Sequence, residues 1–355
     1  MTTKTSRLRR SVVASSLGLL MLGMTACGTA TDTAASAAET TSITSTDTGA
    51  TTSSSDTSTG SSTTTTADAA TSSESPTLEE MVAAGVADGF DQVEWTDPET
   101  GETLTYNIYL PADYDESSSY PMVVYIPDSS LVGDDATAAL SQYGALVWAS
   151  ESQQAETESI VVVPSYPEVI LDDHGSFTMT DYVDMTARLV ESLESEYAVD
   201  TNRVYGTGQS MGAMTIMYLA AQDPDLFAAE MIVSGQWDIT QLTGLADETF
   251  VYTAAAGDDK ASVGQTDVEA MLDEAGVAYS TTTADATAAE ATEAAAEEML
   301  AAGDSANFLT FDEGTVLEAS GSSGSGAMGG EHMASFQPAY EISALRTWLL
   351  QQTAA

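Results

Sequence analysis

From Thr77 onward, short runs rich in β-branched and aromatic residues alternate with stretches of helical periodicity. This alternation is typical of a parallel sheet, because each parallel connection must cross back over the sheet and a helix usually makes that crossing. The run 120–126 (YPMVVYI) is apolar along its whole length and predicts a strand buried on both faces. We therefore expect one α/β domain over residues 77–355, with a mostly parallel, twisted sheet and helices on both faces.

The predicted elements follow the chain in a regular order. An opening hairpin is expected from residues 92–95 and 103–110, joined by a turn through Asp97-Pro98-Glu99-Thr100-Gly101. Further strands are predicted at 120–126, 160–164, 203–205, 229–234, 249–254, 277–282 and 307–311. Helices are predicted at 138–150, 181–196, 211–221, 266–275, 288–302 and 340–351.

The segment Gly208-Gln209-Ser210-Met211-Gly212 stands between a predicted strand and a predicted helix. A G-x-S-x-G pattern in that context is the nucleophile elbow, a sharp strand-to-helix turn that exposes a serine hydroxyl above the sheet. Glycines on both sides relieve crowding in the turn, and the start of the helix places positive charge beside the serine. The pattern predicts Ser210 as a catalytic nucleophile, with a structural serine in a tight turn as the plainer alternative.

A serine nucleophile needs a base, and the chain has only two histidines. His332 follows the last predicted strand and precedes the last predicted helix, so its loop can reach the elbow. His174 comes before Ser210 and would break the chain order of serine, acid and histidine. We therefore predict His332 as the base, with a surface histidine as the alternative. His174 is expected to be a solvated loop residue, or else a contact to substrate at the rim of the site.

The acid of such a site should follow the strand that lies between the serine and the histidine. The predicted strand 249–254 leads into Ala255-Ala256-Gly257-Asp258-Asp259. Asp258 is the first choice, and Asp259 remains the alternative because a shift of one residue in the loop exchanges them. The carboxylate would accept the Nδ1 hydrogen of His332 and hold the imidazole in the required tautomer. An ordinary surface acid is the plainer interpretation of either residue.

Taken together, these residues identify a resemblance to the α/β-hydrolases. The chain resembles the branch of secreted carboxylesterases and depolymerases related to polyhydroxybutyrate depolymerases, feruloyl esterases and prolyl-oligopeptidase-like domains. The stretches that carry the resemblance are 106–114 (YNIYLPADY), 120–130, 197–227 around the elbow, and 331–349 with the histidine. It implies hydrolysis of esters or, less often, of amides, with no cofactor and no metal.

One segment departs from the pattern of these enzymes. Where they often carry His-Gly-x-Gly after the third strand, this chain has Pro127-Asp128-Ser129-Ser130. The resemblance implies that the backbone N–H groups of Ser129 and Met211 hold the oxyanion. Glycines let such an N–H turn toward the substrate, and one missing donor typically lowers turnover by about 10²–10³. Whether this segment forms a working oxyanion hole is left open by the sequence.

The N-terminus has the pattern of an export signal. Four basic residues lie within positions 1–10. The uncharged apolar run 11–24 is shorter than the about 20 residues that a helix needs to span a membrane, and it suits the apolar region of a signal peptide. The following Met24-Thr25-Ala26-Cys27 resembles the lipobox of bacterial lipoproteins, in which the cysteine is lipidated. We expect a lipoprotein signal peptide over 1–26, lipid attachment at Cys27 and a location on the extracellular side of the bacterial cell membrane. An ordinary secretion signal is the alternative.

Residues 27–76 are composed almost entirely of small and polar side chains, with Ile43 as the one large apolar residue. Such a composition cannot bury enough apolar surface to offset the conformational entropy of folding. The segment is expected to be a disordered tether that separates the folded domain from the membrane.

The charge of the chain excludes several classes of function. It has 55 acidic and 8 basic residues and a formal net charge of −47. Binding to nucleic acid needs clustered Lys and Arg, so it is not expected, and contact with anionic membranes is expected only through the lipid anchor. A single cysteine excludes an intramolecular disulfide and disfavours a structural zinc site. The strong like charge favours a monomer.

Three hypotheses for the function follow. The first is a lipid-anchored serine hydrolase that cleaves carboxylic esters, either small or linked to a polymer. The second keeps the same catalytic residues but cleaves short peptides, as prolyl-oligopeptidase-like enzymes do. The third is a surface binding protein that has kept the hydrolase fold and lost the chemistry. The acyl and alcohol groups of the substrate are not determined by the sequence.

Overall fold

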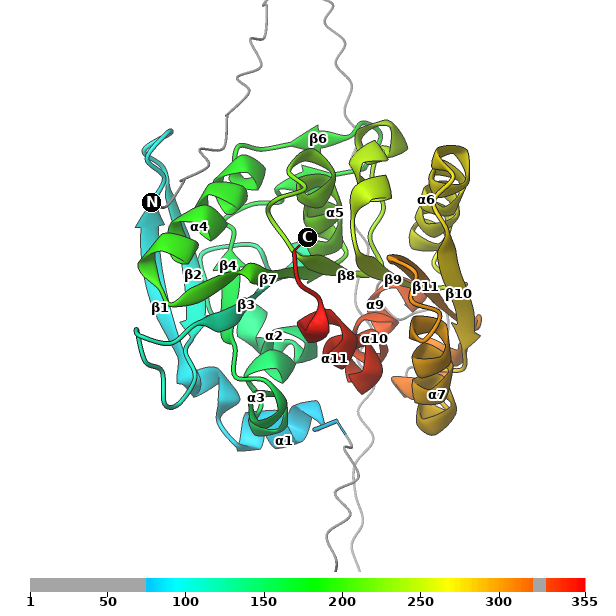
Figure 1. Ribbon diagram of the computed structural model, residues 1–355, viewed down its shortest axis with the longest axis horizontal. Helices are drawn as coiled ribbons and strands as arrows, with labels where there is room; N and C mark the ends of the chain where they lie inside the picture. Colours follow the sequence, from blue (N-terminus) through cyan, green and yellow to red (C-terminus); the bar gives the residue numbers. More distant parts are fainter. Residues whose placement is uncertain (1–74, 322–329, 355) are drawn as a thin grey trace, which may run out of the picture. The chain divides into compact units, whose positions relative to one another are not determined.

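The computed structural model describes residues 75–321 and 330–354, and the predicted signal peptide, Cys27 and all but the last two residues of the predicted tether lie outside them. Its centre is a nine-stranded sheet with the order β1-β2-β4-β3-β7-β8-β9-β11-β10 (Figure 1). The strands are β1 (Phe90–Thr96), β2 (Thr103–Tyr109), β3 (Tyr120–Ile126), β4 (Ile160–Ser165), β7 (Val199–Gln209), β8 (Ala229–Val233), β9 (Phe250–Ala255), β10 (Tyr279–Ala284) and β11 (Ala306–Phe311). Strand β2 is antiparallel to β1 and β4, and the other neighbouring pairs are parallel. The expected mostly parallel sheet is confirmed.

Helices cover both faces of this sheet, as expected (Figure 1). The α-helices are α1 (Leu78–Ala83), α2 (Tyr143–Leu146), α3 (Glu151–Glu156), α4 (Tyr182–Glu196), α5 (Met211–Gln222), α6 (Ala261–Ala275), α7 (Ala289–Leu300), α8 (Thr315–Ala319), α9 (Gly330–Ala334), α10 (Phe336–Glu341) and α11 (Ser343–Gln351). Short 3₁₀ helices are η1 (Val86–Gly89), η2 (Ser129–Leu131), η3 (Ala138–Ser141), η4 (Val147–Ala149), η5 (Ile239–Gln241) and η6 (Thr243–Asp247). Helices α4, α5 and α6 pack on one face, and α1, α2, α7, α8, α10 and α11 pack on the other. In the described part of the chain, no helix combines the length and apolarity needed to cross a bilayer.

Strand β3 shows why the central sheet is apolar throughout. Successive side chains of a strand point to opposite faces. Met122, Val124 and Ile126 accordingly pack in the core on the α5 side, whereas Val123 and Tyr125 pack in the core on the α2 side. All five side chains are fully buried. The unbroken apolar run is therefore the pattern of a strand covered by helices on both sides.

A small hairpin lies apart from the main sheet. Strands β5 (Leu171–Asp172) and β6 (Thr178–Met179) pair with each other in an antiparallel ladder. This hairpin was not predicted, because two-residue strands leave no alternation in the sequence to detect.

The predicted helix over 138–150 is wrong. The segment instead forms η3, α2 and η4, because the backbone at Gln142 is extended, with φ −100° and ψ 145°. Helix α2 then packs so closely on the sheet that a Cβ at Gly144 would lie 2.6 Å from the rings of Tyr125 and Tyr340. These tertiary contacts override the helical propensity of the segment.

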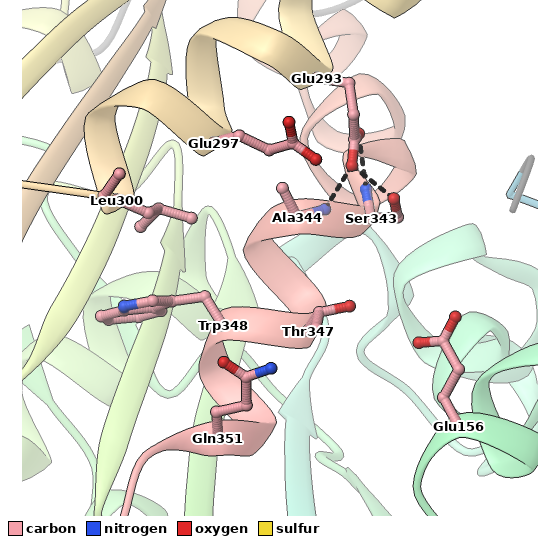
Figure 2. A pocket seen from close by; sticks show the side chains of 10 residues that line it. Glu156, Glu293, Glu297, Leu300, Ser343, Ala344, Thr347, Trp348 and Gln351 are labelled. Carbon is pink, nitrogen blue, oxygen red and sulfur yellow. Dashed lines mark hydrogen bonds between the residues drawn. The ribbon is translucent and has the colours of Figure 1, made fainter.

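The closing helix is likewise interrupted, between α10 and α11. Ile342 has an extended backbone, with φ −69° and ψ 104°. Figure 2 shows that Glu293 of α7 reaches the first turn of α11, where its carboxylate accepts hydrogen bonds from Ser343 N (3.0 Å) and Ala344 N (2.6 Å). A carboxylate from a distant helix therefore satisfies the N–H groups that begin the new helix.

Two buried carboxyl groups lie together on the α5 side of the sheet. Glu230 on β8 is fully buried, Glu248 is 6% exposed, and neither Glu230 oxygen has a hydrogen-bond partner. Burial and the nearby Glu248 raise the pKa of Glu230 well above its ordinary value. Burial and the charges of Asp247, Asp225 and Asp223 raise the pKa of Glu248 to about 8. The folded protein therefore holds protons here that the unfolded chain releases above about pH 4.5.

This pair predicts that stability decreases as the pH rises from about 4.5 through about 8. Because the folded-state pKa values are the higher ones, the free energy of unfolding falls as the pH rises from about 4.5 through about 8. Glu230→Gln removes one of the two titrations. We expect it to raise the free energy of unfolding by roughly 1–3 kcal/mol at pH 8 and to have little effect at pH 5. Urea denaturation at both pH values measures the difference.

Glu298→Gln is the matched control, because Glu298 is exposed on α7 and its substitution removes the same charge. A gain of equal size in both variants at pH 8 would assign the effect to the acidic surface and not to the buried pair.

Candidate active site

The elbow forms where β7 ends and α5 begins. Ser210 has φ 52° and ψ −118°, a conformation that costs a non-glycine residue strain energy. A Cβ on Gly212 would lie 1.9 Å from the carbonyl oxygen of Ile126, and one on Gly208 would lie 2.5 Å from the carbonyl carbon of Gly212. The two glycines are therefore required by the close approach of α5 to the ends of β3 and β7. The backbone N–H of Ser210 donates to Val233 O (3.0 Å), which ties the turn to β8.

Three predicted site residues meet at this turn. Ser210 Oγ lies 2.8 Å from His332 Nε2, and His332 Nδ1 lies 2.7 Å from Asp258 Oδ2. They come from the end of β7, from α9 and from the loop after β9. A hydroxyl, an imidazole and a carboxylate in this order can pass a proton from the serine to the histidine while the carboxylate stabilises the imidazolium.

Asp258 is built to remain ionised. Its carboxyl group is 5% exposed, and burial alone would raise its pKa. The hydrogen bond and charge of His332, with the backbone N–H groups of Ala261 and Lys260, outweigh burial and hold the pKa of Asp258 below its ordinary value. The same carboxylate accepts hydrogen bonds at the start of α6, which explains why this helix begins at Ala261 and not at the predicted Thr266. The adjacent Asp259 is exposed, so of the two acids that the sequence left open, the one that contacts His332 is Asp258.

The residues that hold His332 in place were not predicted from the sequence. The carboxylate of Glu331 accepts hydrogen bonds from Gly257 N (3.1 Å) and Gly314 N (2.8 Å), beyond the ends of β9 and β11. Ser335 Oγ donates to the carbonyl oxygen of His332 (2.7 Å) and lies 2.7 Å from Ser234 Oγ. Helix α9 is therefore fixed to the ends of three strands. A signal for Glu331 was present in the sequence only as an acid beside the histidine, which such an acidic chain makes uninformative.

The serine opens into a pocket of about 410 Å³. Its lining includes the expected oxyanion donors Ser129 and Met211, the apolar side chains of Val169, Leu171, Met214 and Met333, and the polar side chains of Asp172, Asp173, His174, Gln236 and Lys260. Ser129 and Met211 are each the first residue of a helix, where the backbone N–H has no partner within its own helix. The structure thus places both expected donors in the lining, and their role toward the oxyanion stays a prediction.

His174 lies at the rim of this pocket and outside the group around Ser210. Its side chain is 82% exposed, and its Nδ1 is 2.7 Å from Asp172 Oδ1. Asp172, Asp173 and His174 form the one cluster among the described residues whose atoms could surround a metal ion. Lys260 Nζ, however, lies 2.5 Å from Asp173 Oδ2, so the cluster already contains a cation.

Exposed apolar side chains also lie at or near the pocket. Val169 and Met333 line it and are 40% and 37% exposed, respectively. Phe177, between β5 and β6, is 47% exposed and packs against Trp237 with ring centroids 5.0 Å apart. The β5–β6 hairpin and α9 thus present apolar surface close to the serine.

Comparison with known proteins gives a family match. The model of a family named Esterase, described as "Putative esterase", matches residues 98–318. Curated relatives include dipeptidyl-peptidase 5 of Porphyromonas gingivalis, which is 28% identical over 158 residues. That match covers 42% of this chain and 21% of the relative, so the chain spans about a fifth of the length of the curated relatives it matches.

Solved structures show the same fold. A thermostable esterase superposes with a TM-score of 0.60 and 22% identity, over 76% of this chain and 64% of the other. A feruloyl esterase module from Clostridium thermocellum superposes with a TM-score of 0.51 and 14% identity, over 75% of this chain and 90% of the module. The α/β-hydrolase fold expected from the sequence is confirmed.

The contact between His332 and Asp258 predicts unequal effects of two neighbouring substitutions. Asp258→Asn leaves an amide that cannot stabilise the imidazolium, and we expect kcat to fall by about 10³- to 10⁴-fold. Asp259→Asn removes the same charge one residue away, and we expect kcat within about twofold of the wild type, since surface changes away from such contacts are small. Hydrolysis of a p-nitrophenyl ester at pH 7.5 measures both, with thermal melting as the control for folding. Equal losses in the two variants would contradict the role of Asp258.

Proposed function

The chain belongs to the Esterase family and has the fold of the α/β-hydrolases, and from this premise we propose that it is a serine hydrolase that cleaves uncharged carboxylic esters outside the cell. The observation that carries the proposal is the continuous line of hydrogen bonds from Ser210 through His332 to Asp258, at the floor of a pocket. Family membership supports the class of hydrolase, and the geometry supports the assignment of these three residues.

In the proposed mechanism, Ser210 Oγ attacks the carbonyl carbon of the ester while His332 Nε2 takes its proton. The negative oxygen of the tetrahedral intermediate accepts hydrogen bonds from the N–H groups of Met211 and Ser129. The intermediate collapses, the bond to the alcohol breaks, and His332 returns the proton to the leaving oxygen. Water, activated by His332, then attacks the acyl-enzyme and releases the acid and free Ser210.

The charge of the pocket favours neutral substrates. Lys260 is the one Lys or Arg among the residues that line it, and Asp173 already pairs with its ammonium group. An anionic ester would find no unpaired cation there and would approach a strongly acidic protein. The exposed apolar side chains of Val169, Phe177 and Met333 favour an uncharged ester that is small or part of a polymer.

Cleavage of short peptides is a second candidate, favoured by the likeness to dipeptidyl-peptidase 5. Ester hydrolysis and peptide hydrolysis share the same mechanism and differ in the leaving group, which is an alcohol in the first and an amine in the second. Rates on an ester and an amide with the same acyl group distinguish them, since a peptidase retains substantial activity on the amide.

The proposal predicts that Ser210 reacts with a fluorophosphonate probe and that the protein hydrolyses p-nitrophenyl esters. Ser210→Ala removes the nucleophile, and we expect it to abolish labelling and to lower kcat by at least about 10³-fold, leaving the rate due to the oxyanion donors. The profile over acyl chain length measures the depth of the pocket. A folded wild-type protein that neither reacts nor turns over would overturn the enzyme assignment and favour a binding protein.

We further propose that Cys27 carries a lipid that holds the protein on the extracellular side of the membrane as a monomer. Support comes from the basic and apolar start of the chain and from Ala26 directly before the cysteine. In a bacterial host, Cys27→Ala removes the site of lipid attachment. We therefore expect this variant to move from the membrane fraction to the medium or periplasm. Detection of the protein by immunoblot after fractionation tests this, and an unchanged membrane fraction would contradict it.

A further inference from the structure

A buried carboxylate lies directly behind the expected oxyanion donor Ser129. Asp128 follows β3, is 1% exposed and precedes the 3₁₀ helix η2, whose first residue is Ser129. It occupies the segment in which related hydrolases often carry glycine. Without glycine, some other feature must hold the backbone N–H of Ser129 toward the pocket.

Asp128 is the centre of a network of side-chain hydrogen bonds. Its Oδ1 accepts from Ser130 N (2.8 Å), and its Oδ2 accepts from Gln142 Nε2 (2.5 Å) and Gln209 Nε2 (2.9 Å). Gln209 Nε2 also lies 2.9 Å from Gln142 Oε1, which accepts a further hydrogen bond from Tyr125 OH (2.9 Å). Ser130 and the two glutamines therefore supply partners to both oxygens of the carboxylate.

The partners of Asp128 connect three segments of the active site. Gln209 directly precedes the nucleophile Ser210, Ser130 directly follows Ser129, and Gln142 sits where the expected helix 138–150 is interrupted. The carboxylate therefore joins the elbow to the segment that carries the oxyanion donor.

An ionised side chain at this depth is costly unless every oxygen is satisfied. Burial would raise the pKa of Asp128, but the hydrogen bonds from Gln142, Ser130 and Gln209 outweigh it and hold the pKa below its ordinary value. An amide or a hydroxyl could cap the short helix η2 without the burden of a buried charge. We therefore look for a role of Asp128 that requires a charged acceptor and that a neutral cap could not supply.

We propose that Asp128 is a positioning residue that fixes the N–H of Ser129 relative to Ser210, in the place of glycines, by hydrogen bonding to Ser130 and Gln209. The inference rests on the proposed ester hydrolysis and adds a residue to its machinery. Asp128 is among the residues that line the pocket, and its hydrogen bonds go to Ser130, Gln142 and Gln209, so in this proposal it acts through the backbone and through Gln209.

Substitution by asparagine separates this role from a direct effect of charge. A negative charge close to the developing oxyanion opposes it, so loss of the charge alone would raise kcat. In Asp128→Asn, however, the side-chain oxygen can still accept from Ser130 N, and the new NH₂ group then faces the donors Gln142 Nε2 and Gln209 Nε2. The amide groups of Gln142 and Gln209 then repel the new NH₂ group at position 128, and the side chains must move apart. We expect the backbone N–H of Ser129 to shift with them.

The experiment compares wild type and Asp128→Asn in three quantities: kcat and KM for a p-nitrophenyl ester, and the inhibition constant of a trifluoromethyl ketone. The ketone forms a tetrahedral oxyanion on the serine, so its affinity reports the oxyanion donors. We expect kcat and ketone affinity to fall together by about 10- to 100-fold, less than complete loss of one donor, with KM within about threefold. Asp238→Asn is the matched control, since Asp238 caps the 3₁₀ helix η5 in the same way outside the pocket lining.

A rescue variant keeps the test independent of folding. Asp128→Asn combined with Gln209→Glu exchanges donor and acceptor across one hydrogen bond, and we expect it to recover at least about tenfold of the lost kcat. If Asp128→Asn melts below the assay temperature, Gln142→Met removes one donor to Asp128 and should lower kcat and ketone affinity in parallel.

The outcomes are distinct. Unchanged or increased kcat in folded Asp128→Asn would overturn the positioning role while leaving the proposed function intact. So would a fall in kcat without a fall in ketone affinity. A wild-type protein that reacts with neither ester nor ketone would instead overturn the proposed function, and the role of Asp128 with it.

Discussion

The approach of α5 to the end of β3 is the constraint on which the site depends. At Gly212 there is no room for a single additional carbon atom, because the carbonyl oxygen of Ile126 occupies its position. This contact sets where α5 begins, and Ser210 must then turn with a positive φ to join β7 to the helix. Ser234, at the end of the adjacent β8, has a positive φ as well and contacts the Ser335 hydroxyl that holds His332. The strain is therefore located at the ends of two neighbouring strands, where it aims the nucleophile and supports the base.

Two buried carboxyl groups illustrate how surroundings decide the state of a side chain. Asp128 has hydrogen-bond partners in Gln142, Ser130 and Gln209, and its pKa is lowered despite burial. Glu230 has no donor near its oxygens, and its pKa is raised. Both lie beside the central strands of the same sheet. One is a charged hydrogen-bond acceptor next to the nucleophile, and the other is a neutral group whose ionisation would weaken the fold.

Much of this arrangement was predictable from the sequence, for reasons that individual residues make clear. The apolar run of β3 and the glycines around Ser210 are strong local signals, since few conformations suit them. With only two histidines, chain order alone selected His332. Asp258 was preferred, but Asp259 could not be excluded from the sequence, because the choice depends on where α6 begins, and that in turn depends on the carboxylate itself. The interruptions at Gln142 and Ile342 were missed because the groups that contact the chain there, Asp128 and Glu293, are distant in the sequence. Contacts between residues far apart in the chain leave no periodicity in the sequence.

The anchoring of Glu331 has a consequence for where activity can be lost. Because Glu331 accepts hydrogen bonds from Gly257 and Gly314, and Ser335 contacts Ser234, the position of the imidazole is set at the ends of β9, β11 and β8. Glu331, Ser335 and Ser234 are not among the residues that line the pocket. A substitution at any of these three residues can therefore move the imidazole away from Ser210 and lower the rate while the pocket that receives the substrate keeps its lining.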